Sequence, residues 1–328
     1  MRRILDGGRL DEAEAAALVG AIMDGDVGPS LAAGLLVALA ARGETHDEVA
    51  GAARAMRERC VRLDHELPVL VDIVGTGGDS SGTINISTMA ALVVAAAGVP
   101  VAKHGNRAAS GVCGSADVLE AAGLRLDASP QRSARMLRET NFTFLFAPHY
   151  HPAMKQVAPM RGELGVPTIF NLLGPLTNPA RPTHLVVGVA RPAAVEIVAA
   201  ILERMGTSGA VVHGPGGMDE IAGEGATSVL LFGNDVRRFE IDPSAFGVHA
   251  SLAELSGATR DACLAAFLDV LGGEQSARAD VVALNAALAL TVAGARPSLE
   301  DAFASAREVL ASGEALRVFE RAKTVAYA

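Results

Sequence analysis

The spacing of apolar residues divides the chain into a helical N-terminal part and a longer part of mixed character. Before residue 66, apolar residues recur every three or four positions after Asp11, over 31–41 and after the capping-box pair Thr45 and Glu48. Short alanine-rich helices of this kind gain most of their stability by packing on other helices or on a second subunit. This part is therefore predicted to be all-helical and is a candidate dimerisation module, with packing inside the chain as the alternative.

From Pro68 onwards, short apolar runs end in glycine-rich loops and are followed by helices. This alternation predicts a mostly parallel sheet with helices on both faces. Strands are expected at 69–74, 99–102, 185–190, 210–213, 228–232 and 236–241, and helices at 192–205, 261–271, 279–293, 299–311 and 314–322. The turn residues at 233–235 predict a hairpin, and so one antiparallel strand. A ligand is expected beyond the carboxyl ends of the parallel strands, where the glycine loops fall.

Composition and charge narrow the choice of partners. The 328 residues carry a formal net charge of −9, whereas nucleic-acid backbones are held by clustered Lys and Arg, so no nucleic-acid partner is expected. The longest apolar run, 89–102, is interrupted by Gly98 and Pro100 and is too short to cross a bilayer. The three cysteines show no CxxC spacing, and no signal-peptide pattern follows Met1. These features predict a cytoplasmic protein without a membrane partner.

A glycine-rich segment, VGTGGDSSGTINIST at 74–88, follows the first predicted strand. Glycine lets backbone N–H groups approach an anion, and Ser87 and Thr88 place hydroxyls at a helix N-terminus, where the dipole favours phosphate. No lysine follows the last glycine, so the segment is not a Walker loop. A purely structural tight turn is an equal alternative. Asp79 would repel phosphate unless it accepts from sugar hydroxyls or faces a metal ion.

Two further loops carry candidate chemistry. Residues 101–111, VAKHGNRAASG, place Lys103 and open backbone at a strand end, which favours an anion site over a solvated basic loop. His104 is a candidate general base, with a hydrogen-bonding wall residue as the alternative. Asp219 and Glu220 are hard oxygen ligands that suit Mg2+, which keeps its waters and takes phosphate oxygens from the substrate. Because the loops follow parallel strands, we expect them to share one crevice.

Several stretches resemble motifs of the anthranilate phosphoribosyltransferase family, in the same order and at the same spacing. They are residues 75–79 (GTGGD), 85–88 (NIST), 103–120, 168–179 (TIFNLLGPLTNP) and Asp219-Glu220. The resemblance implies transfer of the 5-phosphoribosyl group from phosphoribosyl pyrophosphate (PRPP) to the amine of anthranilate, a step of tryptophan biosynthesis. It also implies Mg2+ as cofactor and a homodimer formed through the helical domain. Such a reaction needs positioning and charge neutralisation rather than a covalent nucleophile, in agreement with the absence of GxSxG, HExxH and Cys-His signatures.

The resemblance also implies a fold and its domain boundaries. The fold is α/β of the nucleoside phosphorylase/phosphoribosyltransferase type, with a mostly parallel sheet containing one antiparallel strand. Residues 1–66 are expected to form the small helical domain, completed by helices near 154–175. Residues 67–153 and 176–328 are expected to form the large domain. The active site is expected between the two domains.

Family roles carried onto the matching positions give a set of expected ligand contacts. PRPP is expected to contact Gly75, Gly78, Asp79, Thr83, Asn85, Ile86, Ser87, Thr88, Lys103, His104, Gly105, Asn106, Arg107, Ala108, Ala109, Ser110, Gly111 and Ser115. Mg2+ is expected at Ser87, Asp219 and Glu220, and anthranilate at Gly75, Asn106 and Arg161. The Arg161 fork suits the substrate carboxylate, with a surface helix arginine as the alternative. Val112, Cys113 and Gly216 depart from the family pattern, in which lysine, serine and an acidic residue are commoner.

Two other functions remain open at this point. A pyrimidine nucleoside phosphorylase shares the fold and reacts at the same sugar carbon, but its Ser-Gly-Arg segment is replaced by KHGNR at 103–107. A non-catalytic, nucleic-acid-binding relative of the same fold would need a basic groove. The acidic charge and the Asp219-Glu220 pair favour metal-assisted chemistry over that alternative.

Overall fold

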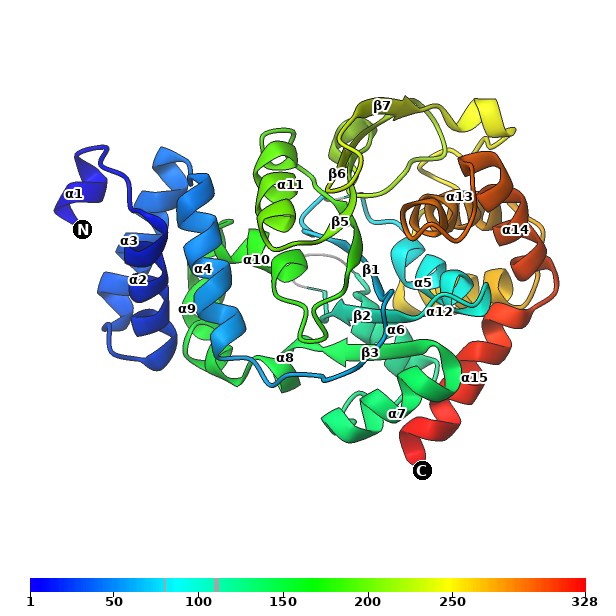
Figure 1. Cartoon of the computed structure of the whole chain (residues 1–328), viewed down its shortest axis with the longest axis horizontal. Helices are drawn as coiled ribbons and strands as arrows, with labels where there is room; N and C mark the ends of the chain where they lie inside the picture. The colour runs from blue at the N-terminus through cyan, green and yellow to red at the C-terminus, as the bar shows by residue number, and fades with distance from the viewer. Residues whose placement is uncertain (80, 109–111) are drawn as a thin grey trace.

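The N-terminal helices form a small domain at one end of the molecule (Figure 1). The computed structural model describes residues 1–79, 81–108 and 112–328. The helices are α1 (Arg2–Leu5), α2 (Glu12–Asp24), α3 (Pro29–Arg42) and α4 (His46–Glu58). Capping boxes begin α2 at Asp11 and α4 at Thr45, the latter as the sequence predicts. The α2 and α4 helices pack closely because Gly51 has no side chain: a Cβ there would lie 2.3 Å from the carbonyl oxygen of Glu12.

A later part of the chain returns to these helices. It comprises the 3-10 helix η1 (Pro152–Gln156) and the helices α9 (Ala158–Leu164) and α10 (Phe170–Leu176). The η1 helix packs on α2, α9 on α3 and α10 on α4. Val157 and Met160 belong to the same apolar cluster as Val19 and Val49. This packing agrees with the expected completion of the small domain near 154–175, and the exact boundaries stay a prediction.

The large domain is built on a seven-stranded sheet of order β3-β2-β1-β4-β5-β6-β7. The strands are β1 (Val71–Gly75), β2 (Val101–Gly105), β3 (Phe142–Phe146), β4 (His184–Gly188), β5 (Ser208–His213), β6 (Thr227–Phe232) and β7 (Arg238–Ile241). All pairings from β3 to β5 are parallel, and β6 runs antiparallel to both of its neighbours. The predicted mostly parallel sheet with one antiparallel strand is confirmed. The prediction of the individual strands missed β3.

Helices cover both faces of the sheet (Figure 1). Successive residues of β4 point to opposite faces. Val186 packs in the cluster that includes α5 (Ile86–Ala96) and α13 (Ala277–Val292). Leu185 and Val187 pack in the cluster that includes α4, α10 and α11 (Ala194–Arg204). The remaining helices are α6 (Ser115–Ala121), α7 (Pro130–Thr140), α8 (Ala147–Tyr150), η2 (Pro215–Gly217), η3 (Pro243–Phe246), α12 (Arg260–Leu271), α14 (Leu299–Ala311) and α15 (Glu314–Tyr327). Within the described ranges, no helix has both the length and the apolarity needed to cross a membrane.

Candidate active site

The carboxyl ends of β1 and β4 support the loop that carries Asp219. This loop follows η2, between β5 and β6. A Cβ on Gly75, the last residue of β1, would lie 2.2 Å from Asp219 Oδ2, and a Cβ on Gly188, the last residue of β4, would lie 1.5 Å from the Asp219 carbonyl oxygen. Glycine at both strand ends therefore lets the loop lie across them. The Gly77 N–H then donates to Asp219 Oδ2 at 2.8 Å.

Glu220 connects the same loop to the start of α5. The Ser87 N–H donates to Glu220 Oε1 at 2.9 Å, and the Thr83 hydroxyl donates to Oε2 at 3.4 Å. A carboxylate at the N-terminus of a helix is favoured by the helix dipole and by the free N–H groups of the first turn. The expected convergence of the 75–88 segment with Asp219 and Glu220 is therefore present in the structure.

The site holds more negative charge than its own residues neutralise. Burial, followed by the nearby Asp79, raises the pKa of Asp219, and burial, followed by Asp219, raises the pKa of Glu220. Both carboxylates are only partly exposed. Like charges this close disfavour ionisation unless a cation joins them.

Lys103 is the nearby buried cation. Its side chain is only 2% exposed, and its ammonium group donates to the Ile73 carbonyl oxygen at 2.6 Å and to Ser87 Oγ at 3.3 Å. Burial lowers the pKa of Lys103, and the charges of Asp72 and Glu220 act in the opposite direction. One ammonium group cannot balance this set of carboxylates, so a divalent cation fits the donors present.

The donor set has the chemistry expected for Mg2+. Asp219, Glu220 and the Ser87 hydroxyl supply hard oxygen atoms where the loop meets the start of α5. In the part of the chain that the structure describes, no group of three or more His, Cys, Asp or Glu residues forms a complete metal cage. Mg2+ typically takes one or two carboxylates and completes its shell with water and substrate phosphate oxygens. The residues therefore fit Mg2+ bound together with a phosphorylated substrate.

The start of α5 offers two buried polar atoms without protein partners. Asn85 Nδ2 donates to the Cys113 carbonyl oxygen at 2.9 Å, which fixes the amide. Asn85 Oδ1 and Thr88 Oγ1 find no hydrogen-bond partner among the described residues. Buried polar atoms are normally paired, so this region is suited to a ligand that both accepts and donates hydrogen bonds. A phosphorylated sugar has both kinds of group.

Side chains of α6 hold the loop that follows β2. Asp117 accepts the backbone N–H groups of Ala108 and Gly114, each at 2.9 Å. The Arg107 side chain donates to Asp117 at 3.1 Å and to Glu120 at 2.7 Å, so its guanidinium lies against α6 and is already paired. An Arg107 contact with PRPP through the side chain would require this pairing to change. Ala109, Ser110 and Gly111 lie outside the described residues.

The other expected residues of this loop lie at its two ends. Asn106 is exposed, and its carbonyl oxygen accepts the Ser115 hydroxyl at 3.2 Å. A Cβ on Gly105 would lie 2.3 Å from Ser115 Oγ, so glycine allows α6 to begin against the end of β2. Burial raises the pKa of the Cys113 thiol to about 12, so this residue is a packing residue rather than a nucleophile.

His104 forms part of the wall and does not face the opening as a base. Its Nδ1 lies 3.1 Å from the Gly174 carbonyl oxygen, and its Nε2 lies 3.2 Å from His151 Nε2. Burial lowers the pKa of His104 to about 4 and that of His151 to about 3. Both rings are therefore neutral at pH 7, and the geometry matches the wall-residue alternative.

Arg161 lies on α9, in the part of the chain that packs on the helical domain. Its Nη2 donates to Asn171 Oδ1 at 3.3 Å, and its guanidinium carbon lies 5.7 Å from the centre of the Phe170 ring. Burial lowers the pKa of Arg161. Among the described residues no carboxylate pairs with it, and no hydrogen bond joins it to Gly75 or Asn106. A half-buried guanidinium with unpaired donors differs from a solvated surface arginine, and it is suited to binding an anion.

Two buried side chains that support the site were missed by sequence reasoning. Asp72, the second residue of β1, accepts a hydrogen bond from Asn178 Nδ2 at 2.7 Å, and burial raises its pKa to about 6. Asn285, on α13, accepts the Ile221 N–H and donates to the Ile221 carbonyl oxygen, both at 2.9 Å. Asn285 thereby holds the residue that follows Glu220. The sequence does carry a signal for both side chains, because each is a single polar residue within an otherwise apolar run.

Comparison with known proteins identifies the relatives of this chain. Residues 67–316 match the glycosyl transferase family a/b domain, and residues 1–60 match the helical bundle domain of the same family. An anthranilate phosphoribosyltransferase from Thermus thermophilus is 49% identical over 98% of this chain and 97% of its own length. One from Pelotomaculum thermopropionicum is 46% identical over 96% of this chain and 92% of its own length.

Solved structures of similar proteins agree with these matches. A crystal structure of anthranilate phosphoribosyltransferase from Thermus thermophilus superposes with a TM-score of 0.94 at 48% identity, covering 100% of this chain and 99% of the other. The structure of the Saccharomyces cerevisiae enzyme in complex with PRPP and Mg superposes with a TM-score of 0.92 at 26% identity, covering 99% and 96%.

Proposed function

The chain belongs to the anthranilate phosphoribosyltransferase family, and from that premise we propose that it transfers the 5-phosphoribosyl group of PRPP to the amine of anthranilate. The products are N-(5-phosphoribosyl)anthranilate and pyrophosphate, in a step of L-tryptophan biosynthesis. The observation that carries the proposal is the placement of Asp219 and Glu220 across the ends of β1 and β4, joined to the start of α5. Family membership sets aside the nucleoside phosphorylase and nucleic-acid-binding alternatives.

The reaction is Mg2+-dependent, and the residues of the chain act mainly by binding and by electrostatics. When bound, Mg2+ neutralises negative charge on the pyrophosphate group. Asp219 and Glu220 would hold the ion with Ser87, and Lys103 places a fixed positive charge behind them. Preorganised charges of this kind stabilise the charge that develops when the leaving group departs. The proposed PRPP contacts are those expected from the sequence.

Anthranilate is proposed to lie near Gly75, with Asn106 and Arg161 as polar contacts. The support is chemical: the half-buried Arg161 fork keeps unpaired donors, and a guanidinium binds a carboxylate through two parallel hydrogen bonds. Asn106 is exposed at the end of β2, where its amide is accessible to a substrate.

For Arg161→Ala we expect the KM for anthranilate to rise about tenfold, which corresponds to ~1.4 kcal/mol, with PRPP binding little changed. The reason is loss of the carboxylate contact without loss of any proposed phosphate contact. Steady-state kinetics with each substrate varied in turn measure both effects. Arg138→Ala, which removes an exposed arginine on α7, is the matched control. An unchanged KM for anthranilate would show that Arg161 does not contact this substrate and is a surface helix residue.

The proposed activity is tested directly by the fluorescence of anthranilate. We expect the signal to fall when PRPP and Mg2+ are present together, and to stay constant when Mg2+ is replaced by a chelator. Folded protein that consumes no anthranilate under these conditions would refute the proposal. Other aromatic amines, and then nucleosides with phosphate, would be the next substrates to try.

The homodimer and the cytoplasmic location belong to the proposal as well. Exposed apolar side chains on the small domain support the dimer: Leu5 is 67% exposed, Leu31 50% and Val37 39%. Burial of such residues against a second copy would stabilise both. A monomeric mass in analytical ultracentrifugation at micromolar concentration would refute the dimer, and a fractionation that places the protein outside the cytoplasm would refute the location.

A further inference from the structure

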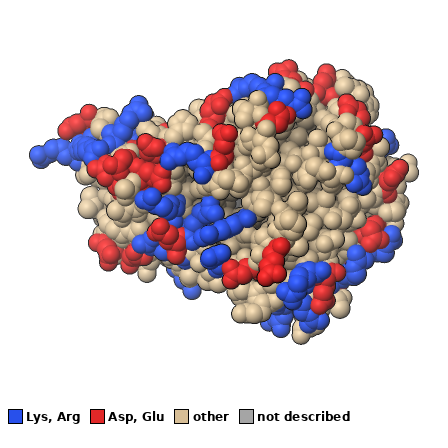
Figure 2. All heavy atoms as spheres, viewed as in Figure 1, with Lys and Arg blue, Asp and Glu red and all other residues tan. Residues whose placement is uncertain are grey.

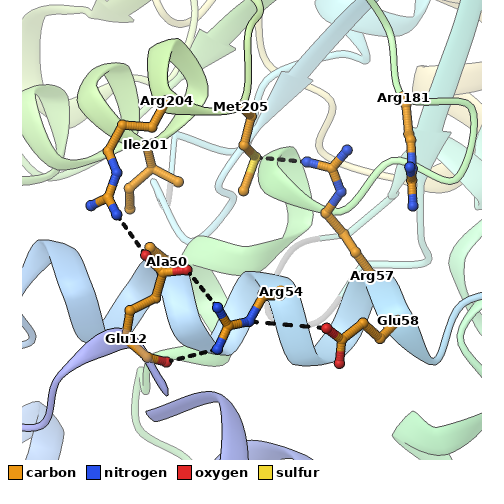
Figure 3. Close-up of a pocket in the computed structure, with 9 residues that line it drawn as sticks. All are labelled: Glu12, Ala50, Arg54, Arg57, Glu58, Arg181, Ile201, Arg204 and Met205. Carbon is orange, nitrogen blue, oxygen red and sulfur yellow. Dashed lines mark hydrogen bonds and ion pairs between the residues drawn. The ribbon is translucent and has the colours of Figure 1, made fainter. Parts of the chain in front are cut away.

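A polar crevice separates the helical domain from the large domain and shares no residue with the candidate active site (Figure 3). Residues of α2 and α4 line one side, and residues of α11 and of the segment before β4 line the other. Its volume is about 360 Å³. Its charged residues are Glu12, Arg54, Arg57, Glu58, Arg181 and Arg204. Figure 2 shows basic side chains gathered where the two domains meet.

Two of the four arginines are already neutralised. Arg54 pairs with Glu12 at 3.0 Å and with Glu58 at 4.0 Å. Arg204 pairs with Glu12 at 2.5 Å and with Asp47 at 3.3 Å. These pairs tie the lining together, and they use the acidic residues of the crevice. None of these pairs includes the other two arginines, Arg57 and Arg181.

Arg57 and Arg181 have no acidic partner. Arg57 Nη1 donates to Met205 Sδ at 2.8 Å, and a thioether is a weak acceptor. Among the residues that the structure describes, no carboxylate lies within ion-pair distance of either side chain. Burial, followed by the charge of Arg181, lowers the pKa of Arg57. The view in Figure 3 shows Arg57 rising from α4 and Arg181 reaching down from the facing segment.

The backbone presents Arg181 from a fixed position. Arg181 has φ of 50°, in the left-handed region that is costly for any residue except glycine. The turn is anchored because its N–H donates to the Asn178 carbonyl oxygen at 3.0 Å, while the Asn178 amide is held by Asp72. The carbonyl oxygen of the preceding residue, Ala180, lies 2.7 Å from His65 Nε2. A donor on a fixed backbone loses less entropy when it binds a ligand.

We propose that Arg57 and Arg181 form a binding site for a small phosphate-bearing anion between the two domains. Two guanidinium forks without an ion-pair partner supply paired donors that match phosphate oxygens, and their positive charge favours a phosphate-bearing anion. The volume admits a phosphate group with a small substituent. The ligand is therefore either free phosphate or a small phosphorylated metabolite.

The test is a calorimetric titration at low ionic strength, because salt screens such contacts. Inorganic phosphate is titrated into the full chain without PRPP, Mg2+ or anthranilate, because PRPP is itself a small phosphorylated metabolite that would compete for the crevice. We expect one saturable site in the unmodified protein, and an affinity about tenfold lower in Arg57→Gln and in Arg181→Gln. Arg181 is exposed, so its variant tests the site without affecting the core. A second titration, with glycerol 3-phosphate, distinguishes the two sources of the ligand. Tighter binding than that of inorganic phosphate indicates a phosphorylated metabolite, and equal binding indicates free phosphate.

The matched control is Arg138→Gln, which removes the same charge from the exposed face of α7. This variant is expected to bind phosphate as tightly as the unmodified protein. Turnover of anthranilate in phosphate-free buffer should be unchanged in all three variants, since neither Arg57 nor Arg181 belongs to the active site. The proposal is overturned if the unmodified protein shows no saturable site, or if Arg181→Gln binds phosphate as well as Arg138→Gln does.

Discussion

Turnover is expected to fall by a thousandfold or more, about 4 kcal/mol of transition-state stabilisation, when Asp219→Ala and Glu220→Ala are combined. The loss follows from removing both carboxylates that would hold Mg2+ against the pyrophosphate group. The pair Asp219→Asn and Glu220→Gln should lose as much activity while keeping the local structure. The amide oxygens of those residues can still accept the Gly77 and Ser87 N–H groups.

The measurement is kcat with saturating substrates, with circular dichroism and thermal unfolding to show that each variant is folded. Glu224→Gln is the matched control, because Glu224 is an exposed carboxylate a few residues further along the same segment. It should retain full activity. Near-normal turnover by a folded double variant would show that Asp219 and Glu220 are not the metal ligands.

Gly188→Ala is expected to lower kcat/KM about a hundredfold although residue 188 is assigned no contact with substrate. The added Cβ would lie 1.5 Å from the Asp219 carbonyl oxygen and 2.3 Å from its carbonyl carbon. These are backbone atoms, which cannot rotate away, so the loop must shift. Gly75→Ala should lower the melting temperature less, because its Cβ would meet the Asp219 carboxylate, which can turn. It should still lower activity, since that turn moves a proposed metal ligand.

Comparing the two variants separates displacement of the loop from general instability. Overpacking costs about 1–3 kcal/mol, so a lower melting temperature should accompany the loss of activity in Gly188→Ala. Gly28→Ala serves as control, since a Cβ at Gly28 meets nothing within 4 Å. A fully active Gly188→Ala variant would mean that the position of the Asp219 backbone is unimportant for the reaction.

The architecture followed from the sequence because the alternation of strands and helices is a local signal. The convergence of the 75–88 segment with Asp219 and Glu220 could also be predicted, since the carboxyl ends of parallel strands share one edge. The strand β3 was missed because Phe142–Phe146 is followed directly by α8, without the glycine-rich loop that marked the other strands.

What the sequence could not predict depends on contacts between distant residues. His104 lies 3.2 Å from His151, and that pairing decides that His104 is a neutral wall residue. The arginine in KHGNR suggests a phosphate ligand, but Arg107 is engaged by Glu120 on the next helix. In both cases the residue type was informative, and the direction of the side chain was set by the packing of a different element.

The return of η1, α9 and α10 to the N-terminal helices also bears on how the protein is made. On the ribosome, α2 and α4 emerge early, while Val157, Met160 and the other apolar residues that cover them are still to be translated. The first domain to be synthesised is therefore among the later parts of the molecule to complete its core. Until that happens, the nascent chain carries an uncovered apolar face, which makes it a natural client for chaperones that bind near the ribosomal exit.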